Sequence, residues 1–166
     1  MFNFNTQKPY LILDLDGTLF HLKGDWSRVH EMIRPYTNVI EACKKAVMNN
    51  DKKFFEELHK LELIQEPVPL KLASIIQNMN IDKYIVTNNT TDTGELINQK
   101  YNLGVKKVIG IDQVSAGKPS SEGLQKIIDE FKLKPENGYY IGNEKTDQIA
   151  TEKAGLSFIY SKIFNY

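Results

Sequence analysis

Two aspartates separated by one residue follow directly on an apolar run, in the segment from Leu11 to Gly17. Residues i and i+2 of an extended chain face the same side, so we expect Asp14 and Asp16 to point into one site. Gly17 allows the backbone to turn sharply after them. Two such carboxylates repel each other unless a cation lies between them or one is protonated. Both solutions suit phosphoryl transfer, in which one acid attacks phosphorus, the other moves a proton and Mg²⁺ neutralises phosphate oxygens.

An Asp-x-Asp-Gly segment can also have a purely structural role. The two acids can simply cap a turn, and the segment alone leaves this open. A calcium-binding EF-hand loop is excluded, because the glycine is misplaced and Thr18 and Leu19 stand where further oxygen ligands and the turn glycine are required. The rest of the chain must therefore decide between a turn and a reactive site.

Two later segments offer groups that bind phosphate. Thr87 and Asn88 end an apolar run and can hydrogen-bond phosphate oxygens, although both residue types are also common in turns. Lys118 stands just before a predicted helix that begins at Pro119, so a cation and a helix N-terminus can face one anion. A solvated lysine is the alternative. A nucleotide-binding P-loop is excluded, because Asp112 replaces its first glycine and Pro119 its Ser or Thr.

A fourth polar segment follows the apolar run from Tyr139 to Gly142. Its Asn143, Glu144 and Asp147 can contribute to the oxygen-rich shell that Mg²⁺ prefers. The alternative is that Asn143 or Asp147 caps the helix that follows.

Five short apolar runs rich in branched and aromatic residues are predicted to be strands. They are Tyr10–Leu15, Lys83–Thr87, Lys107–Ile111, Tyr139–Gly142 and Leu156–Tyr160. Segments with helical spacing separate them, which is typical of an α/β fold with a parallel sheet. Such sheets bind ligands at the carboxyl ends of their strands, where Asp14 and Asp16 are expected to lie.

The interval 20–66 breaks this alternation, because it contains helical patterns and no convincing strand. Its apolar residues from Trp26 to Val47 fall near one helical stripe, which Pro35 is expected to kink or divide. Phe54, Leu58 and Leu61 form one face of a second helix. We interpret 20–66 as a small helical insertion, with residues 1–19 and 67–166 forming the main domain. The alternative is that these helices only cover one face of a single domain.

The composition favours a folded domain without a charge bias. Of the 166 residues 41% are hydrophobic, and 21 Lys and Arg balance 21 Asp and Glu, whereas a general nucleic-acid binder normally has a basic excess. The single Cys43 cannot form an internal disulfide, the first nine residues do not look like a secretion signal, and no apolar stretch is long enough to span a bilayer. We expect a cytoplasmic protein that binds neither nucleic acid nor membrane; the oligomeric state cannot be read.

In chain order, four segments resemble the four-motif signature of the haloacid dehalogenase (HAD) superfamily. They are Asp14-x-Asp16-Gly17-Thr18-Leu19, Thr87-Asn88, Lys118-Pro119 and Gly142-Asn143-x-x-x-Asp147. The resemblance covers nearly the whole chain, and its first motif is highly specific. It implies a Rossmann-like α/β core with a parallel sheet of strand order 5-4-1-2-3 and a small α-helical cap of the C1 type after the first strand.

The resemblance also implies roles for individual residues. Asp14 is the nucleophile and Asp16 the general acid and base. Thr87, Asn88 and Lys118 bind the phosphoryl group, and Lys118 also restrains the nucleophile. These assignments predict a Mg²⁺-dependent phosphatase that hydrolyses a small phosphorylated metabolite through an aspartyl phosphate.

The metal site implied by the resemblance consists of Asp14, Asp16 through its backbone carbonyl, Asn143 and Asp147, with Glu144 as a substitute. The family usually has Asp at the position of Asn143. An amide still offers a carbonyl oxygen, but the loss of one negative charge is expected to weaken Mg²⁺ binding.

Two alternatives to a phosphatase stay open. A phosphomutase of the same superfamily would return the phosphate to a sugar, and a catalytically silent HAD-like binding or regulatory protein is conceivable because of Asn143. Dehalogenation is disfavoured, because the metal-free dehalogenases lack the proton donor that Asp16 provides. Nucleotides, sugar phosphates and phosphoglycolate all remain open as substrates.

The predicted cap is expected to cover the site and exclude water. Trp26, Arg28, His30 and Arg34 are candidates for contacting the leaving group. The alternatives are that Trp26 belongs to the core of the cap and that the arginines are solvated.

Overall fold

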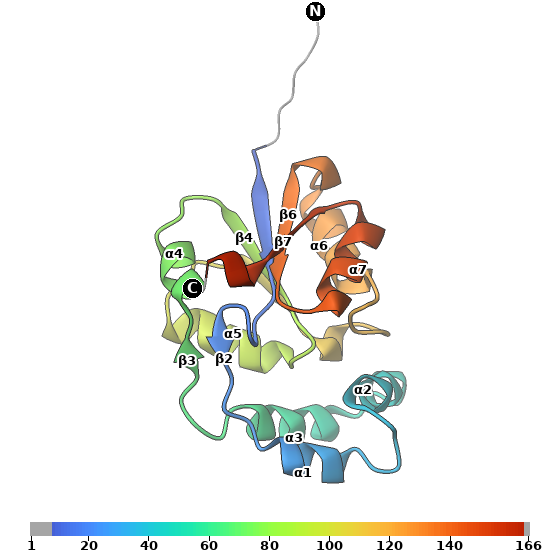
Figure 1. The fold of residues 1–166 in the computed structure, drawn as a ribbon. Coiled ribbons are helices and arrows are strands. Elements are labelled where there is room, and N and C mark those ends of the chain that lie inside the picture. Colours follow the sequence, from blue (N-terminus) through green and yellow to red (C-terminus); the bar gives the residue numbers. More distant parts are fainter. Residues whose placement is uncertain (1–7, 165–166) are drawn as a thin grey trace, which may run out of the picture.

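A five-stranded parallel sheet forms the centre of the protein in the computed structural model, which describes residues 8–164 (Figure 1). Its strands are β1 (Tyr10–Leu13), β4 (Asp82–Val86), β5 (Lys107–Ile109), β6 (Gly138–Gly142) and β7 (Ser157–Tyr160). They lie in the order β5-β4-β1-β6-β7, so the fully buried β1 is central, between β4 and β6. Each strand overlaps its predicted run, and the α/β class is confirmed. The order agrees with 5-4-1-2-3 when these five strands alone are numbered along the chain.

Helices cover both faces of this sheet, because alternate residues of the buried strands face opposite sides. The helices of the main domain are α4 (Lys71–Gln77), α5 (Thr91–Lys100), α6 (Glu122–Phe131) and α7 (Lys145–Ala154), with short 3₁₀ turns η1 (Ile111–Gln113), η2 (Pro135–Asn137) and η3 (Ser161–Ile163). Leu11 and Leu13 of β1 pack in one apolar cluster with residues of α4 and α5. Tyr10 and Ile12 pack in a second with residues of α6 and α7. Each face of the sheet thus has its own core.

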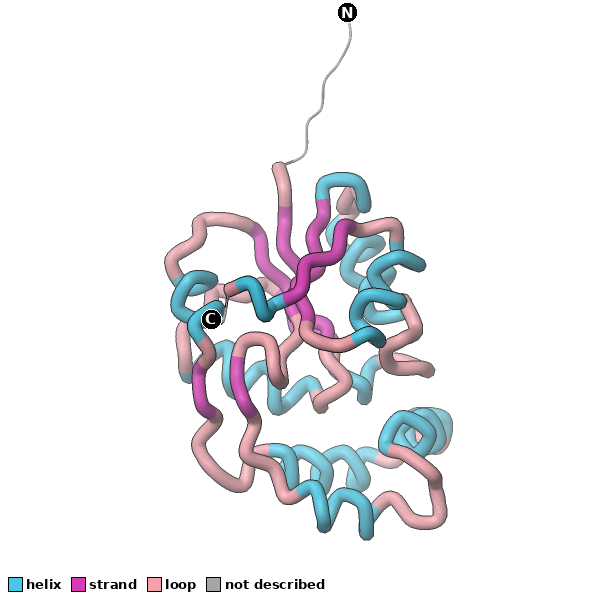
Figure 2. Tube along the Cα trace, viewed as in Figure 1, coloured by secondary structure: helices cyan, strands magenta, loops and turns pink. Residues whose placement is uncertain are grey.

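Three further helices lie beyond the carboxyl end of β1, as a separate layer (Figure 2). They are α1 (Trp26–Met32), α2 (Val39–Met48) and α3 (Lys52–Glu62), and the chain enters and leaves them through β2 (Phe20–His21) and β3 (Val68–Pro69), which pair antiparallel. Pro35 lies in the gap between α1 and α2, where a break was predicted. We call α1–α3 the cap; treating it as a domain of its own is our interpretation.

Local sequence signals explain where the cap helices begin. The side chains of Asp25, Asn38 and Asp51 each accept a hydrogen bond from the backbone N–H three residues later, which satisfies a donor that the first helical turn leaves free. The apolar stripes of the three helices then pack on one another, with Val29, Cys43 and Leu58 among the buried residues. Ile111 of the main domain joins this cluster, so the cap packs against η1.

None of the helices that the structure describes is both long enough and apolar enough to cross a membrane.

Candidate active site

The chain leaves β1 at Asp14 and Asp16, and both side chains line one pocket of about 530 Å³ at the carboxyl edge of the sheet. The backbone N–H of Asp14 still donates to the Ile141 carbonyl of β6 at 2.9 Å, so the neighbouring strand fixes its position. Gly17 then turns the chain with a φ of +74°, and a Cβ at this position would lie 2.3 Å from the Asn143 amide nitrogen. Glycine is therefore required at this turn for both reasons.

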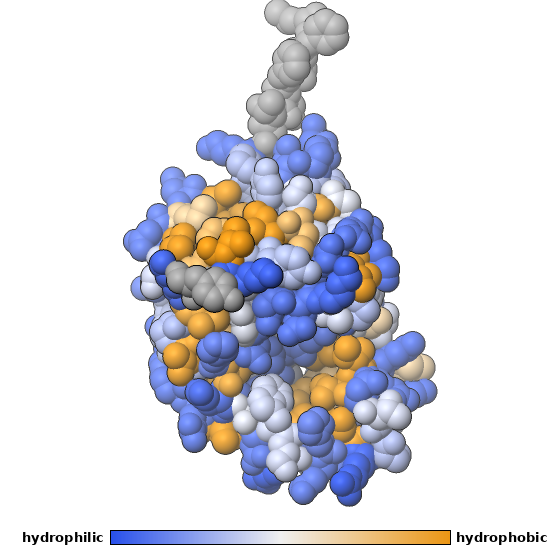
Figure 3. All heavy atoms as spheres, in the orientation of Figure 1, coloured by the Kyte–Doolittle hydropathy of each residue, from blue (hydrophilic) through white to orange (hydrophobic). Residues whose placement is uncertain are grey.

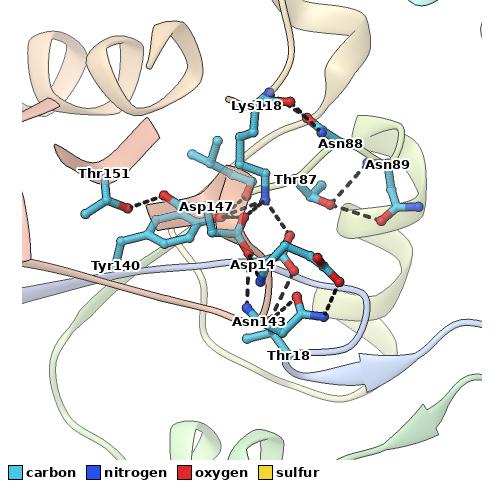
Figure 4. Close-up of polar contacts among 12 residues, drawn as sticks. Asp14, Thr18, Thr87, Asn88, Asn89, Lys118, Tyr140, Asn143, Asp147 and Thr151 are labelled. Carbon is cyan, nitrogen blue, oxygen red and sulfur yellow. Dashed lines mark hydrogen bonds and ion pairs between the residues drawn. The ribbon is translucent and has the colours of Figure 1, made fainter. Parts of the chain in front are cut away.

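Lys118 lies at the centre of a buried polar cluster in this pocket (Figure 4). Its ammonium group donates to Asp14 Oδ1 at 2.7 Å, to Asp147 Oδ1 at 2.5 Å and to the Tyr140 hydroxyl at 2.8 Å. Burial alone would lower the pKa of Lys118, but the two carboxylates outweigh it and raise the pKa, so the ammonium stays charged. Burial also raises the pKa of Asp14, and the Lys118 charge opposes this. The predicted restraint of Asp14 by Lys118 is present as a direct ion pair.

Asp147 has no free carboxylate oxygen in this arrangement. Oδ1 accepts from Lys118 and lies 3.2 Å from the Tyr140 hydroxyl, while Oδ2 accepts from the backbone N–H groups of Asn143 and Glu144. Asp147 is thus the third helical residue of a capping box that starts α7 at Glu144. This geometry gives less support to Asp147 as a metal ligand, because the residue is 1% exposed and one of its oxygens accepts from two backbone N–H groups.

Tyr140, in the middle of β6, is a member of the cluster that the sequence did not indicate. Its hydroxyl donates to the Val86 carbonyl of β4 at 2.9 Å and accepts from Lys118. Burial raises the pKa of this hydroxyl well above its usual range, so it stays protonated. Tyr140 therefore gives the Lys118 ammonium a neutral acceptor beside two charged ones.

The segment after β4 holds the loop of Lys118 in place. Asn88 donates from Nδ2 to the Lys118 carbonyl at 3.1 Å and accepts at Oδ1 from the Lys118 N–H at 2.8 Å. Both amide atoms of Asn88 are therefore engaged with backbone, and the second N–H of its Nδ2 is the part of this side chain that could still contact phosphate. Thr87 also lines the pocket, and its hydroxyl donates to Asn89 Oδ1 at 3.0 Å, so it would have to exchange that hydrogen bond in order to donate to phosphate.

Oxygen atoms from two segments meet beside Asp14. The Thr18 hydroxyl lies 3.1 Å from Asp14 Oδ2 and 3.2 Å from Asn143 Oδ1, so these two oxygens border the same small region. Within residues 8–164, no three His, Cys, Asp or Glu side chains are grouped as a metal site. An ion here would instead use the Asp14 carboxylate, the Asn143 amide oxygen and a backbone carbonyl such as that of Asp16. This all-oxygen set fits Mg²⁺.

Asp16 is less buried than Asp14, and the Leu22 N–H donates to its Oδ1 at 2.9 Å. Burial raises the pKa of Asp16, while the hydrogen bond from Leu22 and the neighbouring His21 oppose the rise. A carboxyl group with a raised pKa is better suited to give up and take back a proton near neutral pH. The two acids thus differ in their surroundings: Asp14 is paired with a lysine, and Asp16 is not.

The cap forms the opposite wall of the pocket with Trp26, Val39, Ile40 and Leu58. Trp26 is 38% exposed, so it is not part of the cap core. The predicted contacts from Arg28, His30 and Arg34 are wrong: these side chains are exposed, and the pocket lining does not include them. For Arg28 and His30 the reason is the phase of α1, which buries Val29 between them and turns both outward; Arg34 follows the end of this helix at Met32.

Glu62, at the end of α3, joins the cap to the main domain. Its carboxylate is only 2% exposed and accepts hydrogen bonds from the Thr90 hydroxyl at 2.7 Å, from the Thr93 hydroxyl at 2.6 Å and from the Asn89 amide at 3.3 Å. Burial raises the pKa of Glu62, and the hydrogen bonds from Thr93 and Thr90 oppose this. The sequence carried one signal for this role, because Glu62 follows Leu58 by four residues on the buried stripe of α3.

A model of the family described as haloacid dehalogenase-like hydrolase matches residues 26–161. No curated protein sequence matches the chain.

Several solved structures share the fold. CbbY from Rhodobacter sphaeroides, in complex with phosphate, has a TM-score of 0.66 at 15% identity over 93% of this chain and 86% of that one. A putative phosphoglycolate phosphatase from Lactobacillus plantarum has a TM-score of 0.63 at 16% identity over 93% and 87%. A putative HAD-hydrolase, YfnB from Bacillus subtilis, bound to magnesium, has a TM-score of 0.56 at 16% identity over 93% and 89%. At these identities the likeness shows the fold alone.

Proposed function

Because the chain belongs to the haloacid dehalogenase-like hydrolase family, we propose that it is a Mg²⁺-dependent phosphatase for a small phosphorylated compound. The proposal includes an aspartyl phosphate formed on Asp14. Two fold neighbours support it in outline, since CbbY is described in complex with phosphate and YfnB as bound to magnesium.

The observation that carries the proposal is the buried ion pair between Asp14 and Lys118 at the base of the pocket. The 2.7 Å contact keeps a carboxylate oriented at the pocket floor, and a carboxylate is a known nucleophile toward phosphorus. The ammonium places positive charge where a phosphoryl group would bind, which stabilises the charge on its oxygens. A buried Asp–Lys pair that served only stability would have no reason to line a pocket.

The proposed reaction has two steps. Asp14 attacks phosphorus in line with the leaving oxygen, and Asp16 gives that oxygen a proton as its bond to phosphorus breaks. The deprotonated Asp16 then takes a proton from water, which attacks phosphorus and releases Asp14 and inorganic phosphate. The Lys118 charge stabilises the phosphoryl oxygens throughout while its N–H groups stay on Asp14, Tyr140 and Asp147, and the Thr87 hydroxyl exchanges its hydrogen bond to Asn89 for one to a phosphoryl oxygen. Mg²⁺ bound by Asp14, Asn143 and the Asp16 carbonyl would supply further neutralisation of phosphoryl charge.

Asn143 favours a second candidate function, a phosphate-ester-binding protein that turns over little or nothing. The second side-chain oxygen next to Asp14 belongs to the neutral amide of Asn143. The site therefore has one negative charge fewer for a divalent cation than it would have with Asp at this position. Phosphate release from any ester in the presence of Mg²⁺ would decide against this candidate.

The test is a screen of the purified protein with Mg²⁺ against a panel of phosphorylated metabolites, alongside Asp14→Asn. We expect phosphate release by the wild type and a loss of at least about a thousandfold in the variant, since removal of a nucleophile leaves only binding effects. Asp129→Asn, an exposed change on α6, is the matched control. Activity retained by a folded Asp14→Asn variant would contradict the assignment of the nucleophile.

A further inference from the structure

We propose that the substrate carries an uncharged leaving group with an apolar or aromatic body, and no second anionic group beside the phosphate. This inference rests on the proposed phosphatase function and names the substrate class for the same pocket. It comes from the wall that faces Asp14 and Lys118.

The wall opposite the acids is apolar and comes mainly from the cap. Trp26 of α1 and Val39 and Ile40 of α2 form its accessible part, and the buried Leu58 of α3 and Ile111 of η1 complete its lining. Figure 3 shows hydrophobic atoms on the cap beside the hollow that separates it from the sheet domain. Covering such a surface with an apolar or aromatic group releases water and is favourable. A leaving group that reaches the cap therefore gains most if it is itself apolar.

The charges of the pocket point the same way. Among the described residues that line it, Lys118 is the only lysine or arginine, and its three N–H groups already have acceptors in Asp14, Tyr140 and Asp147. The carboxylates of Glu62 and Glu144 line the pocket as well. A carboxylate or second phosphate on the leaving group would meet like charges and no unengaged lysine or arginine, which costs binding energy.

The inference makes a prediction about phosphoglycolate, the compound named in the description of one fold neighbour. The Lactobacillus plantarum protein is described as a putative phosphoglycolate phosphatase, and phosphoglycolate has a carboxylate in its leaving group. A pocket with an apolar cap and surplus carboxylates disfavours that compound. We therefore expect phosphoglycolate to be a poor substrate for this protein.

Binding of two non-hydrolysable phosphonates tests the inference without requiring turnover. Benzylphosphonate and 4-carboxybenzylphosphonate share a ring and differ by one carboxylate, and both are titrated calorimetrically into the full chain with Mg²⁺. The titrations are done at about pH 8, where an ordinary imidazole carries little charge. We expect benzylphosphonate to bind at least tenfold more tightly, about 1.4 kcal/mol. Equal or tighter binding of the carboxylated compound, or no binding of either, would overturn the inference.

Two lysine substitutions on α2 test whether the apolar wall causes the preference for benzylphosphonate. Ile40→Lys places a cation on the apolar wall, so the preference for benzylphosphonate should shrink about tenfold. Met48→Lys adds the same charge on the same helix at a side chain that is 66% exposed and does not line the pocket, so the preference should stay as in the wild type. If the two variants behave alike, the wall does not select the ligand.

A third variant covers the case in which Ile40→Lys does not fold. Trp26→Ala removes a side chain that is already 38% exposed, so the cap core is little disturbed. It should weaken benzylphosphonate binding about fivefold more than it weakens binding of inorganic phosphate. An equal effect on both ligands would contradict a ring site on the cap.

The two proposals fail in different ways. If the phosphonates discriminate as expected while no ester is hydrolysed in an Asp14-dependent manner, the phosphatase function is wrong and the ligand class stands. If phenyl phosphate and 4-carboxyphenyl phosphate are both hydrolysed through Asp14 with similar kcat/KM, the phosphatase function stands and the ligand class is wrong.

Discussion

The change Tyr140→Phe removes one hydroxyl from the buried cluster around Lys118 and leaves the ring in place. The Lys118 ammonium then has two acceptors for its three N–H groups, because only Asp14 and Asp147 remain. Lys118 is 5% exposed, so water does not easily replace the lost partner. A hydrogen bond to a charged group contributes about 1.5–3 kcal/mol. We expect the free energy of unfolding to fall by about 2 kcal/mol, which lowers Tm by about 4–8 °C for a chain of this length.

The same variant should lower kcat/KM about tenfold, because Lys118 is held less firmly against Asp14. The assay is hydrolysis of the best ester from the screen, at a temperature at which unfolding curves show every variant folded. Tyr84→Phe is the matched control: Tyr84, on β4 of the same sheet, is as fully buried as Tyr140, and it is not one of the three acceptors of the Lys118 ammonium. A Tyr140→Phe protein as stable and as active as Tyr84→Phe would refute the positioning role of the hydroxyl.

Three further predictions concern groups around the pocket. Asn143→Asp adds a carboxylate near Asp14 Oδ2 and should tighten Mg²⁺ binding about tenfold, as measured by calorimetric titration; unchanged affinity would place the ion elsewhere. Asp147→Asn leaves Lys118 with one carboxylate and should lower the free energy of unfolding in urea by about 3 kcal/mol, whereas exposed Asp129→Asn should not; equal stabilities would contradict the cluster. Burial raises the pKa of Glu62 above its ordinary 4.5, so the folded state holds this proton more tightly than the unfolded chain. Stability should therefore fall as pH rises from 4.5 through the folded-state pKa, and Glu62→Gln should flatten this fall in thermal unfolding; parallel curves would refute the burial cost.

The sheet and the position of the two acids were predictable from the sequence. Strands buried on both faces give continuous apolar runs, so all five were found, with ends that differ from the structure by at most two residues. Parallel strands present their carboxyl ends on one edge, which brings Asp14, Thr87 and Asn143 to the same pocket. By contrast, β2 and β3 have two residues each, too few for any periodic pattern to show.

The partners of each site residue were less predictable, because they depend on tertiary neighbours. Tyr140 looks like any aromatic residue of an apolar strand, and only its distance to Lys118 shows its role. Asn88 was assigned to phosphate because of its type, whereas the structure uses both ends of its amide on the Lys118 backbone. The error at Arg28 was avoidable, since a helix that buries Val29 turns the adjacent residue outward.

The most direct test of the account is the detection of the phosphorylated residue itself. The protein is mixed with a turned-over ester and Mg²⁺, quenched in acid within the first turnover and treated with borohydride, which reduces an acyl phosphate to an alcohol. The account predicts that mass spectrometry of the peptide that contains both acids finds homoserine at position 14, and that Asp16 is unmodified. Modification at Asp16, or an unmodified peptide under conditions in which phosphate is released, would contradict the central claim that Asp14 is the nucleophile.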